Sequence, residues 1–207
     1  MSSFWIILIT VTPMAMDYRI KTVELLPIES YPARTTLNQV TIAADPYDTN
    51  EKSYLAFDVK KLNSQGYFPL HVIIKNDSKS FLKIQTRNIT LITASGQQLY
   101  TTPATVVVSD VIDPGLTSHI PLVGTADRTT SVKTGSPLWD FTNKELTNRY
   151  LDPGTVNDGF LFFYSQDAKQ NFFAGSTLYI PKLDEEGASK TVGPFFIRLD
   201  SALSSSK

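Results

Sequence analysis

Short runs of β-branched and aromatic residues, separated by turn residues, recur along the chain from residue 20 onward. Runs of this length bounded by Gly, Pro, Asn and Asp are typical of strands. The predicted strands cover residues 20–28, 39–44, 69–76, 81–85, 88–94, 105–112, 159–165, 176–183 and 193–200. The close spacing of the turn signals favours an antiparallel β-sandwich over a parallel sheet with crossover helices.

The run GFLFFYS is apolar or aromatic at five consecutive positions. Phe160, Phe162 and Tyr164 would face one side of a strand, and Leu161 and Phe163 would face the other. We therefore expect this strand to be covered on both faces and to lie at the centre of its sheet.

Two stretches have helical rather than strand periodicity. Leu55, Val59 and Leu62 recur at i, i+4 and i+7, which predicts a helix over about residues 48–62. The segment DFTNKELTNRYLDPG predicts a second helix over about residues 141–151, because it is followed by Asp-Pro-Gly. The sequence thus predicts a mainly β sandwich with two short helices.

The first turns of both predicted helices carry capping-box spacing. Asp48 and Glu51 would cap the first helix, and Thr142 and Glu145 the second, each pair satisfying exposed amides of its first turn. Acidic side chains there also favour the positive end of the helix dipole. Helix capping is the prediction for all four residues.

A cation site is the alternative reading of the first of these segments, ADPYDTNEK. Asp45, Asp48, Asn50 and Glu51 offer the oxygen ligands that Ca²⁺ prefers. Their spacing lacks the alternating ligands and the central glycine of an EF-hand loop. These four residues are therefore weak metal candidates.

The length of 207 residues predicts one domain, which we place at residues 17–203. Within it, the segment 113–138 has little periodicity and many turn residues, so we expect a long surface loop. The polar turn NDSKS, at residues 76–80, predicts a β-hairpin between the strands on either side. Residues 204–207 are expected to form a disordered tail.

The first sixteen residues contain the apolar run FWIILITV at residues 4–11, which has the length of a signal-peptide core and is too short to span a bilayer. No basic residue precedes the run, and Ala15 is the small residue near a possible cleavage point. A buried first strand is the alternative. We predict export, to the periplasm, the outer envelope or the medium, with membrane contact through residues 1–16 alone, if they are uncleaved.

Charge and cysteine content exclude several kinds of chemistry. Nineteen basic and twenty acidic residues leave a net charge of −1, so no excess of positive charge is available for nucleic acid. The chain has no cysteine, which excludes disulfides, thiolate metal sites and cysteine nucleophiles. Nothing in the sequence predicts a cofactor.

Four motifs together resemble a group of uncharacterised exported bacterial proteins, often lipoproteins. They are VTIAADPYDTNEKSYLAFDV, GYFPLHVIIKNDSKSFLKI, NITLITASGQQL and PGTVNDGFLFFY, and the resemblance extends from about Lys21 to Asp200. It implies an immunoglobulin-like β-sandwich and a cell-envelope setting, with no assigned activity. This chain departs from the lipid-anchored members because it has no cysteine to lipidate.

Histidine chemistry rests on two residues. His71 lies in the apolar strand PLHVII and is predicted to be a satisfied core or face residue. His119 lies in the long loop near Asp113 and Ser118, but no G-x-S-x-G motif surrounds that serine. We therefore predict no catalytic residues.

The aromatic cluster GFLFFYSQDAKQNFF has two readings. Tyr164, Phe172 and Phe173 would form a sugar- or protein-binding surface if exposed, whereas core packing is the simpler reading. The sequence predicts a non-enzymatic binding or structural module of the cell envelope, with an envelope protein or a glycan as its partner. The alternatives are an envelope hydrolase that uses His119 and loop carboxylates, and a carbohydrate-binding module.

Overall fold

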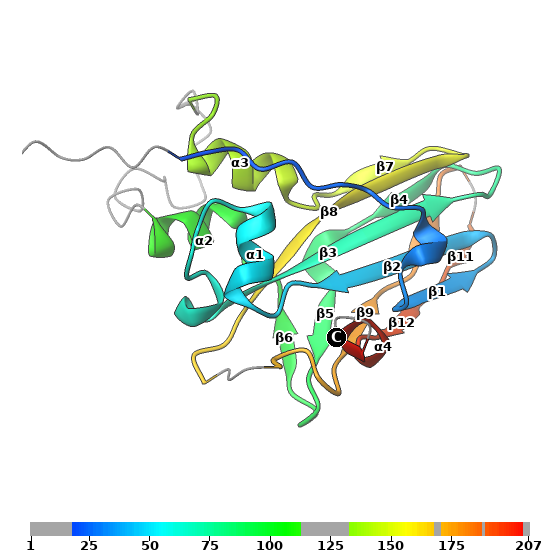
Figure 1. The fold of residues 1–207 in the computed structure, drawn as a ribbon. Helices are drawn as coiled ribbons and strands as arrows, with labels where there is room; N and C mark the ends of the chain where they lie inside the picture. The colour runs from blue at the N-terminus through cyan, green and yellow to red at the C-terminus, as the bar shows by residue number, and fades with distance from the viewer. Residues whose placement is uncertain (1–17, 113–132, 168–170, 188, 205–207) are drawn as a thin grey trace, which may run out of the picture.

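The computed structural model describes residues 18–112, 133–167, 171–187 and 189–204, and within them the chain forms three antiparallel sheets of four strands (Figure 1). Sheet A has the order β1-β2-β3-β8, from Arg34–Leu37, Val40–Pro46, Tyr67–Asn76 and Thr155–Tyr164. Sheet B has the order β11-β10-β4-β7, from Thr191–Val192, Leu183–Glu185, Leu82–Ile84 and Arg149–Leu151. Sheet C has the order β12-β9-β5-β6, from Phe195–Arg198, Thr177–Ile180, Thr90–Ile92 and Gln98–Tyr100. The predicted mainly β, sandwich-like fold is confirmed.

The helices are short. The α-helices are α1 (Asn50–Ala56), α2 (Ala104–Val111), α3 (Pro137–Lys144) and α4 (Asp200–Ser204), and the 3₁₀ turns are η1 (Ile28–Ser30), η2 (Asn63–Gln65) and η3 (Thr86–Asn88). None of the helices in the described part of the chain is long and apolar enough to cross a membrane.

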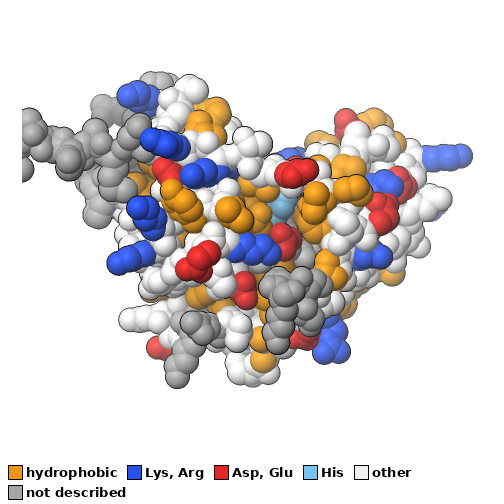
Figure 2. Space-filling model, in the orientation of Figure 1, with side chains coloured by type: hydrophobic (Ala, Val, Ile, Leu, Met, Phe, Trp, Pro, Cys, Tyr) orange, Lys and Arg blue, Asp and Glu red, His pale blue; other side chains and the backbone are white. Residues whose placement is uncertain are grey.

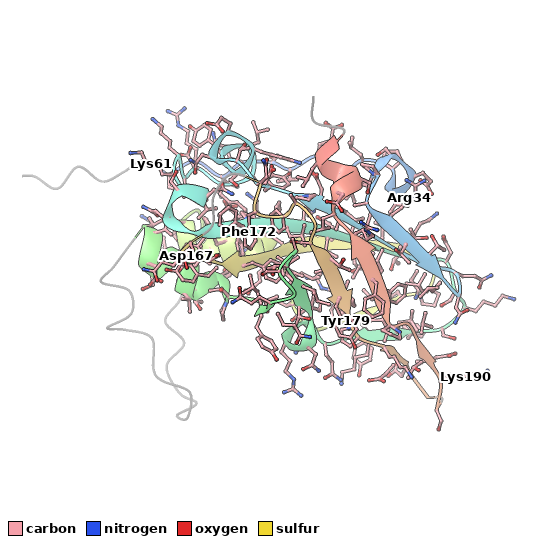
Figure 3. The ribbon with its side chains drawn as sticks, turned by 90° about the horizontal axis from the view of Figure 1, so that it is seen from below. Arg34, Lys61, Asp167, Phe172, Tyr179 and Lys190 are labelled. Carbon is pink, nitrogen blue, oxygen red and sulfur yellow. The ribbon has the colours of Figure 1, made fainter. Side chains whose placement is uncertain are left out.

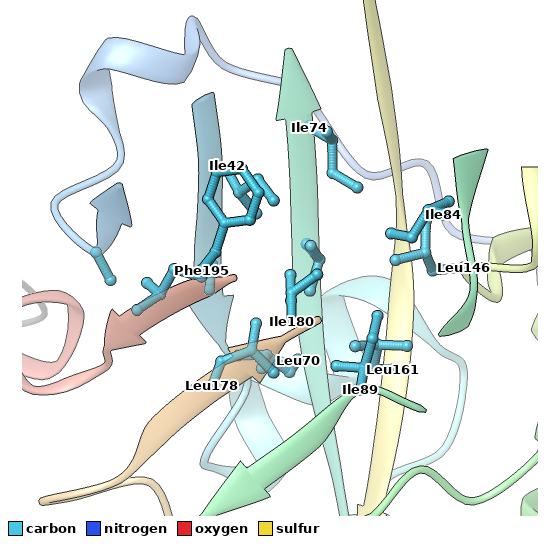
Figure 4. Close-up of a cluster of buried hydrophobic side chains, with 14 of the residues drawn as sticks. Ile42, Leu70, Ile74, Ile84, Ile89, Leu146, Leu161, Leu178, Ile180 and Phe195 are labelled. Carbon is cyan, nitrogen blue, oxygen red and sulfur yellow. The ribbon is translucent and has the colours of Figure 1, made fainter. Parts of the chain in front are cut away.

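The main core lies between one face of sheet A and the two smaller sheets. Alternate residues of β3 enter it, so Leu70 and Ile74 are fully buried there. Figure 4 shows Leu70 beside Leu178 and Ile180 of sheet C, with Ile74 farther along β3 in the same cluster. The alternation of β3 thus determines which of its residues face the sandwich interior.

The opposite face of sheet A is covered at one end by α1, α2 and α3 (Figure 1). An aromatic cluster fills the space beneath these helices and includes Phe57, Phe141, Phe160 and Phe162, all of which are at most 2 % exposed. The extended segment 18–27 runs along the same face of the sheet.

The prediction for β8 was right about burial and wrong about position. Phe160 and Phe162 enter the aromatic cluster while Leu161 and Phe163 enter the main core, so both faces are covered. The strand nevertheless lies at the edge of sheet A. On the free side of β8, isolated β-bridges join Thr102 to Phe162 and Glu145 to Phe160. These bridges cover part of the strand edge.

Three predicted elements were wrong. The segment predicted as a strand at 105–112 is helix α2, and the segment 20–28 forms no strand. The predicted hairpin at NDSKS is absent because β3 belongs to sheet A and β4 to sheet B. Each outcome depends on contacts with residues far away in sequence, which a local pattern does not contain.

The described residues form four α-helices where the sequence predicted two, and the two predicted helices overlap α1 and α3 only in part. The first ends at Ala56, because Phe57 turns to extended backbone. The second begins at Pro137, inside the predicted loop, and ends at Lys144, after which β7 begins at Arg149. The first sixteen residues and most of the predicted loop lie outside the described residues.

Candidate functional site

The ADPYDTNEK segment holds a helix start. The N-cap is Thr49, whose Oγ1 accepts a hydrogen bond from Lys52 N at 3.1 Å, so the prediction for Asp48 was wrong by one residue. Glu51 lies in the first turn, but the capping hydrogen bond is accepted by Thr49, and the predicted capping box of Asp48 and Glu51 is not formed. A hydroxyl at the N-cap makes the same bond to the first-turn amides that a carboxylate would make.

The structure does not bring the candidate cation ligands together. Asp45 Oδ1 accepts a hydrogen bond from Lys52 Nζ at 2.6 Å, and Asn50 exchanges two hydrogen bonds with Ser64. Within the described part of the chain no group of three or more His, Cys, Asp or Glu side chains could hold a metal ion.

The capping box predicted in the second helix was wrong. Ser136 is the N-cap, and its Oγ accepts from Trp139 N at 3.2 Å. Thr142 lies near the end of α3 and donates to Leu138 O at 2.7 Å. Glu145 follows the helix and accepts from the Ala104 amide, so it ties α3 to the start of α2. Ser-Pro is the helix-start signal that the sequence contains there.

His71 is a buried, hydrogen-bonded residue of β3, in agreement with the prediction. Its Nε2 lies 2.7 Å from Asp158 Oδ2 on β8, and its ring stacks on Phe160 at 4.6 Å between centroids. The hydrogen bond from His71 holds the pKa of Asp158 below its ordinary value, although partial burial acts in the opposite direction. His119, with Asp113 and Ser118, lies outside the described residues.

Asp158→Ala should destabilise the fold by about 1–3 kcal/mol at neutral pH, because it leaves the buried His71 ring without its partner. A carboxyl whose pKa is lowered on folding contributes stability above its ordinary pKa of about 4, and this stability is lost as the pH falls from there through the lower pKa of the folded state. Urea unfolding between pH 2 and 7 should therefore show a smaller loss of stability below pH 4 in Asp158→Asn than in the wild type. If the free energy of unfolding fell in acid as steeply in Asp158→Asn as in the wild type, the pairing of Asp158 with His71 would not be the cause of the loss.

The predicted aromatic surface is not formed by the three residues chosen for it. Phe173 is fully buried in the main core, and Phe172 stacks on Phe68 at 4.2 Å between centroids. Tyr164 is exposed, beside Tyr67. Both phenylalanines pack on the main core, so the simpler reading of core packing holds for them.

A different set of aromatic residues is exposed, on the outer face of sheet C. The inner face of this sheet carries the buried Leu91, Leu178 and Ile197. Because side chains alternate along a strand, their neighbours point outward. The outward residues are Phe196 on β12, Tyr179 on β9, Thr90 on β5 and Tyr100 on β6. We call these four residues the aromatic row; Figure 3 labels Tyr179 on the side of the molecule opposite to α4 and η1.

Strand register places the members of the aromatic row side by side. Phe196 pairs with Tyr179, Tyr179 with Thr90, and Thr90 with Tyr100. At about 4.8 Å between neighbouring strands, the row is roughly 14 Å long. Phe196 and Tyr100 are 53 % and 65 % exposed at its two ends, and the rings of Tyr179 and Phe196 lie 5.2 Å apart.

The next outward line across sheet C is mostly uncharged. It consists of Arg198, Thr177, Ile92 and Gln98, paired in that order. Arg198 lies 3.4 Å from Asp200, so its charge is partly compensated. The face therefore combines aromatic rings with hydroxyl and amide groups and little net charge.

Sequence reasoning missed the aromatic row because its residues come from four separate strands. Each strand does contain the signal, an aromatic or hydroxyl side chain next to a buried aliphatic one, as in Leu178-Tyr179. Only the strand order shows that Tyr100 and Phe196 belong to one surface.

The chain matches no protein-family model and no curated protein. It is similar to the yjhA protein of Bacillus subtilis at 7 % identity and a TM-score of 0.37, over 72 % of this chain and 78 % of that one. A putative lipoprotein (ycdA) of Bacillus subtilis has 13 % identity and a TM-score of 0.38, over 80 % of this chain and 38 % of that one. A functionally unknown protein from Listeria monocytogenes has 15 % identity and a TM-score of 0.34, over 78 % and 80 % of the two chains. Because all three TM-scores are below 0.5, these likenesses support no inference about function.

Proposed function

We propose that this protein is a non-enzymatic binding module of the bacterial cell envelope and that its ligand is an extended, neutral glycan. The observation that supports the proposal is the aromatic row across the outer face of sheet C. Export is supported by the signal-like run at residues 4–11.

The chemistry of the aromatic row suits a sugar. A pyranose ring has an apolar C–H face, which packs on an aromatic ring, and a rim of hydroxyl groups, which need hydrogen-bond partners. Tyr100 and Tyr179 provide both a ring and a hydroxyl. Thr90, between them, has a smaller side chain, so the surface is lower at that position of the row. Tyrosine also supplies a large contact area at a low cost in conformational entropy.

The shape of the row favours a chain of sugars over a single one. Its length of roughly 14 Å, from three strand spacings, exceeds one pyranose ring. Phe196 and Tyr100 at the two ends are exposed while Thr90 between the tyrosines is 7 % exposed, and Gln98 and Thr177 stand beside the row to bond hydroxyl groups. The low net charge of the face favours a neutral ligand over an ionic one.

Tyr100→Ala and Phe196→Ala should each weaken glycan binding by about tenfold, because each removes the burial of one aromatic ring under a sugar. Isothermal titration with chitotetraose and co-sedimentation with insoluble chitin, both neutral glycans, measure this loss. Both side chains are exposed, so the variants should keep the wild-type melting temperature.

Tyr150→Ala is the matched control, because this tyrosine is 51 % exposed but lies on β7 of sheet B. It should bind both glycans as the wild type does. Equal losses in the control and in the row variants would mean that exposed tyrosines bind glycan without a specific site, and the proposal would fail. Wild-type protein that binds neither probe would also refute it.

A further inference from the structure

A cleft with basic walls lies at the helical end of the molecule, away from the aromatic row. It has a volume of about 530 Å³ and is formed by the start of the segment 18–27, the residues after α1 and the end of α2. Figure 2 shows basic side chains gathered at this end, and Figure 3 labels Lys61 well away from Tyr179. We call this feature the basic cleft.

Charge is concentrated in the basic cleft. Its lining contains four basic side chains, Arg19, Lys21, Lys60 and Lys61, against one carboxylate, Asp58, which leaves three net positive charges. The whole chain has a net charge of −1, so this surplus is a local feature. Clefts lined by one sign of charge concentrate ligands of the opposite sign.

The one carboxylate of the cleft is already engaged. Asp58 accepts a hydrogen bond from the Arg19 amide at 3.0 Å and pairs with Lys21 at 3.4 Å. Burial acts to raise the pKa of Asp58, but the bonds from the Arg19 amide, Tyr54 and Lys21 outweigh it, so the pKa is lowered and the carboxylate stays ionised. Lys21 also lies 4.4 Å from the centroid of the Tyr54 ring.

Three basic side chains remain for a ligand. Within the part of the chain that the structure describes, the Arg19 guanidinium and the Lys60 and Lys61 ammonium groups make no ion pair or hydrogen bond. All three are exposed, and they line the same cleft. An anion there would gain several charge-assisted hydrogen bonds, one of them from a guanidinium.

Apart from Gln65 and the hydroxyl groups of Tyr18 and Tyr54, the rest of the lining is apolar. Val59, Val111 and Ile112 are partly buried and pack against the aromatic cluster beneath the helices, as does Tyr18. An apolar wall beside a basic rim is a poor match for a small inorganic anion, which would leave that wall in contact with water. The volume is in the range of pockets that hold ligands of drug-like size.

We propose that the basic cleft binds an organic phosphate with an apolar body, its phosphate held by Arg19, Lys60 and Lys61 and its body against Val59, Val111 and Ile112. The site is independent of the aromatic row, so each is tested without the other.

Isothermal titration with three soluble probes tests the proposal. Dihexanoyl phosphatidic acid carries the charge and the apolar body, inorganic phosphate the charge alone, and dihexanoyl phosphatidylcholine the body with a zwitterionic head. We expect the phosphatidic acid to bind at least tenfold more tightly than either of the others. Its binding should weaken as salt rises, because the cations are solvent-exposed.

The variant Lys60→Glu/Lys61→Glu should weaken binding of the phosphatidic acid by at least tenfold. Lys83→Glu/Lys190→Glu is its control, since both lysines are exposed, the change in net charge is the same, and Figure 3 shows Lys190 at the opposite end from Lys61. If both variants lost affinity for the phosphatidic acid equally, overall charge would explain the binding, and the basic cleft would not be the site. If inorganic phosphate bound as tightly as the phosphatidic acid, the apolar wall would not contribute to binding, and that part of the proposal would fail. If no probe bound, the whole proposal would fail.

Discussion

Phe162→Ala should lower the free energy of unfolding by about 3–5 kcal/mol, which is the range found for removing a buried aromatic side chain. Phe162 is fully buried, and its ring lies 5.5 Å from that of Phe57 and 5.6 Å from that of Phe141. Alanine there would leave a cavity between sheet A and two separate segments of the helical layer. Because these helices are short, their stability depends on this packing rather than on helix propensity.

Urea denaturation followed by circular dichroism and tyrosine fluorescence measures this loss. Tyr164→Ala is the control on the same strand, since Tyr164 is exposed, and it should cost less than about 1 kcal/mol. If Phe162→Ala cost no more than Tyr164→Ala, the helices would not be packed on sheet A as described.

Asn76→Ala should destabilise the protein by about 3 kcal/mol, because it removes a fully buried side chain whose hydrogen bonds join two sheets. Asn76 Nδ2 donates to the carbonyl oxygens of Ser80 and Leu151, each at 2.9 Å. Its Oδ1 accepts from the amide and hydroxyl of Ser78 at 3.1 and 2.6 Å. Alanine would leave the carbonyl of Leu151 without this donor in a buried setting.

Asn143→Ala is the control for this substitution. Asn143 is exposed and makes one hydrogen bond, to Trp139 O, so its loss should cost about 1 kcal/mol or less. Chemical denaturation of both variants compares the two costs directly. A loss below 1 kcal/mol for Asn76→Ala would show that the link between β3 and β7 does not stabilise the sandwich.

The alternation of apolar residues predicted the buried strands well. β3 and β8 were located from sequence, including the two-sided burial of β8, because these patterns are local. The order of the strands could not be predicted, because pairing depends on residues far apart in the chain. The three-sheet arrangement and the edge position of β8 were therefore found only in the structure.

The segment 105–112 shows how a valine-rich run misleads. Its residues favour a strand by propensity, but Ala104, Val107 and Val108 are buried with helical spacing and Val111 continues it. Pro103 precedes the helix, where its missing amide costs nothing. Packing against the aromatic cluster decided the outcome over intrinsic propensity.

The two surfaces proposed to bind ligands were the least predictable part. The aromatic row combines residues of four strands, and the basic cleft combines the segment 18–27 with residues near α1 and α2. The residues of each surface lie far apart in the sequence, so no local pattern indicates either one. By contrast, the burial of His71 was predicted, because its immediate neighbours in sequence are apolar and indicate a buried strand.

The most direct test of the glycan-binding proposal is an NMR titration of isotope-labelled protein with chitotetraose, following the backbone amides. The proposal predicts the largest shifts at Thr90, Tyr100, Tyr179 and Phe196, with a common saturation curve. Saturable shifts confined to another surface, or none at millimolar glycan, would contradict it.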